Sequence, residues 1–110
     1  MYRLSVIIED VFKKYLPIAE SLGVTFNLDF PDPTKRIAKP SRVKEPLDKH
    51  VSAALKRTKG EVKILVKKDG IEIVDNGTVL SPMSLALINK PDHITAKSRV
   101  GFGTSVFIKF

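Results

Sequence analysis

Apolar residues in the first part of the chain recur with the spacing of a helix and then with that of a strand. Residues 5–22 are predicted to form a helix. From Leu4 onward apolar residues fall on one helical face, at Leu4, Ile7, Ile8, Val11, Tyr15, Ile18, Ala19 and Leu22. Ser5 can cap the first turn of this helix, and Gly23 can end it. Apolar and polar residues alternate over residues 24–30, which predicts a half-buried strand.

The middle of the chain predicts a short strand, a second helix and a hairpin. The short edge strand is predicted over residues 36–38. Proline lacks the N–H that a helix interior requires, so the regular part of the second helix is predicted to begin at Pro46. Alternating residues 61–67 and 71–75 flank an Asp-Gly pair and predict the hairpin.

The last part of the chain predicts a short helix followed by two strands. Ser81 can cap the helix, a proline follows at its first position, and the helix ends near Asn89. Residues 94–98 and 104–110 are predicted to be strands. This order of elements predicts an α/β two-layer sandwich, a mixed β-sheet with helices on one face, formed by a single domain over residues 1–110.

Composition places the chain among globular proteins and excludes several kinds of chemistry. Of 110 residues, 43% are hydrophobic and 28% charged, and no apolar run approaches the ~18 residues that span a bilayer. We therefore expect a cytoplasmic protein with no membrane partner. The absence of cysteine excludes disulfides and thiolate catalysis. Of the two histidines, His50 is predicted to pack within the fold and His93 to be solvated.

The charge balance favours anionic partners. Nineteen basic residues against twelve acidic ones give a net charge of +7, which attracts nucleic acid, nucleotide phosphates or acidic protein surfaces. The densest group of basic residues is formed by Lys35, Arg36, Lys39, Arg42 and Lys44. A solvated surface that only maintains solubility is an equally good interpretation.

Three motifs follow one another in an order typical of one protein family. Residues 53–58 are A-A-L-K-R-T, similar to an asparagine box usually written N-A-L-K-Y-T. Residues 74–77, V-D-N-G, resemble a glycine box, D-x-G-x-G. Residues 94–108 closely resemble a closing motif, I-x-V-x-S-x-x-G-x-G-T-x-F-x-I. With the order of elements, these motifs resemble the ATP-binding domain of sensor histidine kinases (the GHKL or Bergerat fold) over essentially the whole chain.

The departures from this family concern magnesium and the phosphates. In the family, the asparagine of the box holds magnesium, and the position one turn earlier is an asparagine or an acidic residue. Here these positions are Ala53 and Lys49. A methyl group cannot coordinate a hard cation, and an ammonium group repels it. Val79 replaces the second glycine of the glycine box, and residues 80–95 contain no glycine. The resemblance therefore implies that this chain has lost the lid and the phosphate loop of the family by shortening of this segment.

The resemblance also implies a set of nucleotide-binding residues, if the site is kept. Asp75 would accept a hydrogen bond from the adenine amino group, Gly77 would let the backbone approach the base, and Thr104 would hold a water beside it. The full set is Asp75, Gly77, Gly101, Gly103, Thr104, Lys49 and Lys56. A plain turn is the alternative interpretation of residues 75–77, and solvated surface lysines are the alternative for the last two.

These features predict a non-catalytic histidine-kinase-like module that acts in binding or regulation, with no catalytic residue and no metal site. The resemblance implies partners in two-component signalling, namely a response regulator or a kinase dimerisation domain. One alternative is a protein that binds ATP or ADP through lysines without magnesium. A second alternative is a basic nucleic-acid-binding protein on the same scaffold.

Overall fold

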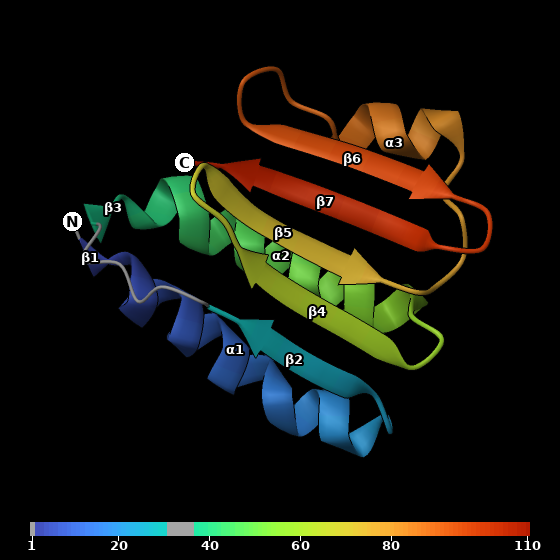
Figure 1. Cartoon of the computed structure of the whole chain (residues 1–110), viewed down its shortest axis with the longest axis horizontal. Coiled ribbons are helices and arrows are strands. Elements are labelled where there is room, and N and C mark those ends of the chain that lie inside the picture. The colour runs from blue at the N-terminus through green and yellow to red at the C-terminus, as the bar shows by residue number, and fades with distance from the viewer. Residues whose placement is uncertain (1, 31–36) are drawn as a thin grey trace.

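A five-stranded mixed sheet forms one layer of the protein. The computed structural model describes residues 2–30 and 37–110. The strand order is β2-β4-β5-β7-β6, in which β2 runs parallel to β4 and the other neighbours are antiparallel (Figure 1). The strands are β2 (Thr25–Asp29), β4 (Glu61–Val66), β5 (Gly70–Asp75), β6 (Ile94–Arg99) and β7 (Gly103–Lys109). This arrangement confirms the mixed sheet predicted from the sequence.

Three helices cover one face of this sheet: α1 (Leu4–Ser21), α2 (Pro40–Arg57) and α3 (Pro82–Ile88). Val106 and Ile108 of β7 point to the same face, because residues two apart on a strand share a face. Ile108 belongs to the core under α1 and α2, whereas Val106 belongs to a smaller cluster under α3. All three helices therefore lie on one side, which confirms the predicted two-layer sandwich.

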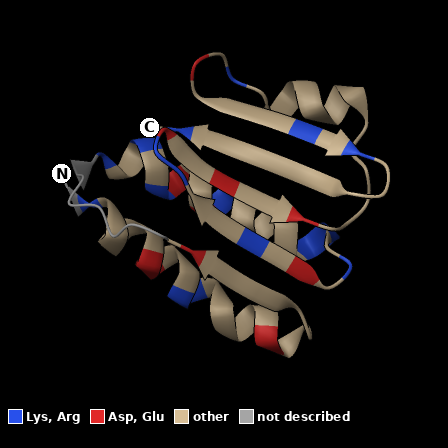
Figure 2. Ribbon diagram, viewed as in Figure 1, with Lys and Arg blue, Asp and Glu red and all other residues tan. Residues whose placement is uncertain are grey.

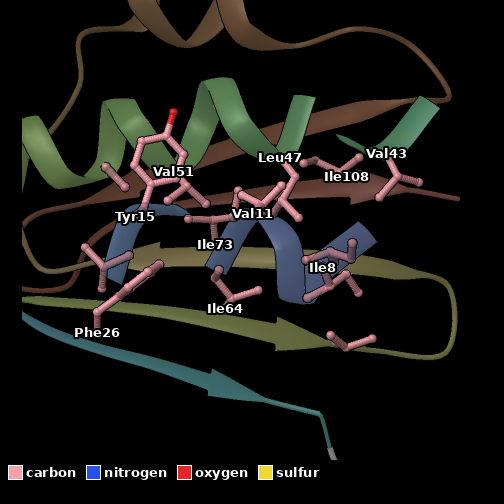
Figure 3. Close-up of a cluster of buried hydrophobic side chains, with 14 of the residues drawn as sticks. Ile8, Val11, Tyr15, Phe26, Val43, Leu47, Val51, Ile64, Ile73 and Ile108 are labelled. Carbon is pink, nitrogen blue, oxygen red and sulfur yellow. The ribbon is translucent and has the colours of Figure 1, made fainter. Parts of the chain in front are cut away.

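The main core lies between the sheet and the pair α1 and α2, as Figure 3 shows. Its fully buried side chains include Ile8, Val11, Val43, Leu47, Val51, Ile64, Ile73 and Ile108. The smaller cluster joins Leu85 and Ile88 of α3 to β6 and β7. None of the helices within the described residues is long and apolar enough to cross a membrane.

Two features at the start of the chain differ from the predicted elements. A two-residue strand, β1 (Tyr2–Arg3), pairs antiparallel with β3 (Ile37–Ala38), and nothing in the hydrophobic pattern predicts β1. Two residues are too few to show an alternation. Of the expected edge strand and basic group, Lys35 and Arg36 lie outside the described residues.

The start of α2 corrects the prediction that the regular helix begins at Pro46. The helix begins at Pro40, and Pro46 lies inside it. In a regular helix the carbonyl of Arg42 would accept a hydrogen bond from the N–H of residue 46, which proline lacks. Here Nε2 of His93 lies 3.0 Å from this carbonyl. Because a carbonyl can only accept, Nε2 carries the proton and donates.

His93 and Arg42 thereby join the beginning of α2 to the connection between α3 and β6. The guanidinium of Arg42 donates in return to the backbone carbonyl of Asp92, at 2.9 Å. His93 is half-buried, so the expectation that it is solvated is wrong. The histidine supplies the hydrogen bond that the proline removes.

We expect His93→Ala to lower the free energy of unfolding by about 1 kcal/mol, because it leaves the Arg42 carbonyl without a donor. In Pro46→Ala the helix regains its own N–H at this position, so His93→Ala should cost clearly less in that background. Urea denaturation of the four proteins of this double-mutant cycle measures the coupling. Equal losses in both backgrounds would show that His93 does not replace the missing donor.

Candidate functional site

The residues that the family resemblance singles out meet where β5 ends. Asp75 is the last residue of β5 and lies opposite Thr104 near the beginning of β7. The C-terminal end of α2 reaches the same place, because Arg57, its last residue, binds Asp75. The structure therefore brings together Asp75, Gly77, Gly103 and Thr104, while Gly101 lies in the exposed turn between β6 and β7.

The carboxylate of Asp75 is enclosed by the protein itself. Nε of Arg57 lies 2.8 Å from one carboxylate oxygen, and the other oxygen accepts a hydrogen bond from the N–H of Gly77 at 2.9 Å. The Asp75 side chain is 0% exposed and that of Arg57 is 14% exposed. In this conformation the carboxylate presents no surface to a ligand.

Two glycines permit this close arrangement. A Cβ at Gly77 would collide with the backbone carbonyl of Arg57, and a Cβ at Gly103 would collide with that of Asp75. Gly103 also has a φ of 95°, which is accessible mainly to glycine. The chain's own backbone therefore accounts for the absence of a side chain at both positions.

Asn76, which sequence reasoning treats as part of a turn, fixes the segment that leaves α2. Its side-chain oxygen accepts hydrogen bonds from the backbone N–H groups of Lys59 and Glu61, both at 3.2 Å. The same oxygen lies 2.9 Å from the hydroxyl of Thr58. The turn after β5 is thus bonded to the connection between α2 and β4, which holds Asp75 and Arg57 in place.

Thr104 takes part in a second internal network, on the side of the site toward α3. It is buried, and its hydroxyl lies 3.0 Å from that of Ser98 on β6. The Ser98 hydroxyl also accepts a hydrogen bond from the backbone N–H of Leu80 at 2.9 Å. This network ties the segment before α3 to the sheet, and the Thr104 hydroxyl already has a partner within the protein.

The two lysines predicted at the phosphate end lie on the surface of α2. Lys49 and Lys56 are exposed, and Ala53 between them is half-buried. Seven residues separate the two lysines, which is about two helical turns. They share one side of the helix with Arg57, the residue that sequence reasoning missed. A signal existed in the sequence, because Arg57 stands where the asparagine box has tyrosine.

His50 is a buried, neutral imidazole on the same helix. Its residue is 4% exposed, in agreement with the prediction that it packs within the fold. Burial is the main cause that lowers the pKa of His50 from 6.5 to about 4, and the neighbouring positive charges of Lys49, Arg57 and Lys90 lower it further. Protonation of His50 is therefore unfavourable in the folded state.

We expect the free energy of unfolding to decrease as the pH is lowered, because of His50. Between pH 6.5 and about 4 the unfolded chain binds a proton that the folded chain does not, so the free energy of unfolding decreases by up to about 3 kcal/mol. His50→Leu should lack this component when urea denaturation is compared at pH 7 and pH 4.5, whereas the control His93→Gln should keep it. The same pH dependence in wild type and His50→Leu would refute this assignment.

We expect Asp75→Asn to lower the free energy of unfolding by about 3 kcal/mol, because it leaves the buried guanidinium of Arg57 without its counter-charge. Arg57→Met should also destabilise the protein, since it leaves a buried carboxylate. The double variant removes both charges, so its loss of stability should be smaller than the sum of the two single losses. Additive losses in thermal or urea denaturation would contradict a tightly coupled ion pair.

Comparison with known proteins identifies the fold. No protein-family model and no curated protein sequence matches the chain. Among solved structures, the nucleotide-free catalytic domain of the histidine kinase ThkA matches with a TM-score of 0.76 and 17% identity, covering 98% of this chain and 94% of its own. The Acinetobacter baumannii histidine kinase AdeS matches with a TM-score of 0.73 and 15% identity, covering 98% of this chain and 65% of its own.

A third match is ThkA in complex with the response regulator TrrA, with a TM-score of 0.73 and 16% identity. It covers 98% of this chain and 40% of that chain. These matches agree with the resemblance found in the motifs, and they extend over nearly all of the described elements. The chain has the fold of the catalytic, ATP-binding domain of sensor histidine kinases.

Proposed function

We propose that this domain is a non-catalytic module with the histidine kinase catalytic fold, and that it binds a signalling protein instead of turning over ATP. The observation that carries this proposal is the ion pair between Arg57 and Asp75. In the family that the motifs resemble, this carboxylate accepts a hydrogen bond from adenine. Here both of its oxygens are already bonded within the protein and its surface is closed.

The residues at the phosphate end support the same proposal, because they do not fit magnesium. Ala53 offers no oxygen ligand and Lys49 carries a positive charge, whereas magnesium requires oxygen donors. The described residues include no group of three or more metal-ligating side chains that could hold a metal ion. No step that depends on magnesium is therefore assigned to this chain.

The proposed partner is a response regulator or a kinase dimerisation domain. One of the similar structures, ThkA, is in complex with a response regulator, which supports this class of partner. The chain itself offers exposed apolar side chains on α3, where Met83 is 76% exposed and Leu87 is 79% exposed. Their position on one short helix gives a partner two adjacent apolar side chains to bury. We do not propose nucleic-acid binding, which rests on net charge alone.

We expect no phosphate release from ATP and no autophosphorylation by the purified chain with magnesium. Ala53→Asn should not restore either activity, because the Arg57–Asp75 pair still closes the position that binds adenine in the family. A radiolabelled-ATP assay, with an active histidine kinase catalytic domain in parallel, measures both activities. Magnesium-dependent phosphate release that Asp75→Asn abolishes would contradict the proposal.

We expect at least one domain in a panel of purified response-regulator receiver and kinase dimerisation domains to bind the immobilised chain in biolayer interferometry. Changing Met83 and Leu87 together to Ser should weaken this binding at least tenfold. The matched control changes two other exposed apolar residues to Ser, Ile18 of α1 and Leu22 just after α1, and should leave the binding unchanged. Equal binding by both double variants, or no binding by any panel member, would contradict the proposed partner class.

A further inference from the structure

The face of the sheet that lies opposite the helices is open. Within the described residues the three helices pack on the other face, so the outward side chains of the strands are available to solvent or to a partner. Antiparallel strands commonly leave one face to water, and such a face carries mainly polar side chains. In Figure 2 the sheet lies in front of α2, with the open face toward the viewer and Lys and Arg segments on β6 and at the end of β7.

Apolar side chains lie in the middle of this open face. Val74 of β5 and Phe107 of β7 are half-buried there, and they are diagonal neighbours, because Phe107 stands opposite the residue two before Val74. The ring of Phe107 extends toward Gly70 of β5. Phe102, in the turn between β6 and β7, is 71% exposed and lines a hollow of about 180 Å³ together with Val74. A partner can therefore bury several apolar side chains at this place.

Positive charges flank these apolar side chains on β6 and β7. Lys97 and Arg99 of β6 and Lys109 of β7 are exposed on the same face, because they alternate with core residues along their strands. None of the three forms an ion pair within the described residues. The guanidinium carbon of Arg99 lies 5.2 Å from the centre of the Phe102 ring, so a charged and an apolar group are presented side by side.

The acidic residues of the open face are either paired or distant from these cations. Glu61 binds Lys63 at 3.2 Å, and both residues belong to β4. Glu72 of β5 binds Lys67 at 3.0 Å. Asp29 lies on β2, at the opposite edge of the sheet from β6. The β6 and β7 side of the face therefore has an excess of positive charge. The open-face patch is defined by the following residues: Val74, Phe102, Phe107, Lys97, Arg99 and Lys109.

We propose that the open-face patch binds an acidic segment of a partner protein, which places apolar side chains against Val74 and Phe107 and carboxylates against the cations of β6 and β7. Protein interfaces commonly combine an apolar centre with a polar rim, and complementary charges select the partner and fix its register. A second copy of this chain does not fit, because it would bring the same excess of positive charge against itself. The proposal goes beyond partner binding by α3, which lies on the other face of the sheet.

Fluorescence anisotropy of a labelled peptide tests the ligand class on the full chain. A peptide of about twelve residues, composed of glutamate, aspartate and leucine, should bind. Serine in place of its leucines should weaken binding at least threefold, because the apolar centre is then not buried. A peptide with lysine in place of its acidic residues should not bind. No binding of the acidic peptide, or tighter binding of single-stranded oligothymidine or of phosphatidylglycerol vesicles, would overturn the proposal.

Two double variants with the same net charge separate the open-face patch from general attraction. Lys97→Gln with Lys109→Gln should weaken binding of the acidic peptide at least tenfold. The control, Lys13→Gln with Lys44→Gln, removes two exposed lysines of α1 and α2 and should change the binding less than twofold. Equal losses in the two proteins would overturn the proposal.

The turn between β6 and β7 offers a matched pair of variants for the apolar contribution. Phe102→Ser should weaken binding of the acidic peptide at least threefold, because Phe102 lines the hollow beside Val74. Val100 is 85% exposed in the same turn and does not line that hollow, so Val100→Ser should leave the binding unchanged. Equal effects of the two variants would contradict a contact at this hollow.

Binding of the signalling partner by α3 provides an independent readout of the same variants. Lys97→Gln with Lys109→Gln leaves α3 intact, so we expect binding of the signalling partner to persist while binding of the acidic peptide is weakened. Met83→Ser with Leu87→Ser should have the opposite effect. Loss of both kinds of binding in the lysine variant, with its fold intact by circular dichroism, would overturn the proposal of a second, separate surface.

Discussion

The buried carboxylate of Asp75 joins the C-terminal end of α2 to the end of β5 and the turn that follows it. Arg57 binds it from the end of α2, and the N–H of Gly77 binds it from the turn after β5, at 2.8 and 2.9 Å. Charges buried in this way interact strongly with each other and are costly to separate. Gly77 and Gly103 lack the side chains that would keep the three backbones apart. The geometry of the whole site depends on this contact.

The same contact changes what the fold can do. In the histidine kinase ATP-binding domains that the motifs resemble, the corresponding carboxylate recognises adenine and an asparagine holds magnesium. Here the carboxylate binds Arg57, and Ala53 and Lys49 occupy the magnesium positions. The chain keeps the kinase catalytic fold, and the proposed partner binding rests on the exposed apolar residues of α3.

The spacing of apolar residues predicts most of the elements, because each strand or helix that covers the core must place apolar side chains on its inner side at regular intervals. The start of α2 is not predictable in this way, since the donor that replaces the missing N–H of Pro46 is His93, 51 residues from Arg42 in the sequence. Motifs predict that Asp75, Gly103 and Thr104 lie together. They do not predict the pairing of Arg57 with Asp75, because only the folded chain brings these two charges into contact, although an arginine in place of a tyrosine was a visible sign.

We propose that Arg57 closes the carboxylate of Asp75 to adenine. The most direct measurement is the exchange of the Arg57 Nε proton with solvent, followed by NMR with and without adenosine. We predict slow exchange and a resonance that adenosine does not move, because Nε stays bonded to a fully buried oxygen. Exchange as fast as that of an exposed guanidinium, or displacement of the resonance by adenosine, would contradict it.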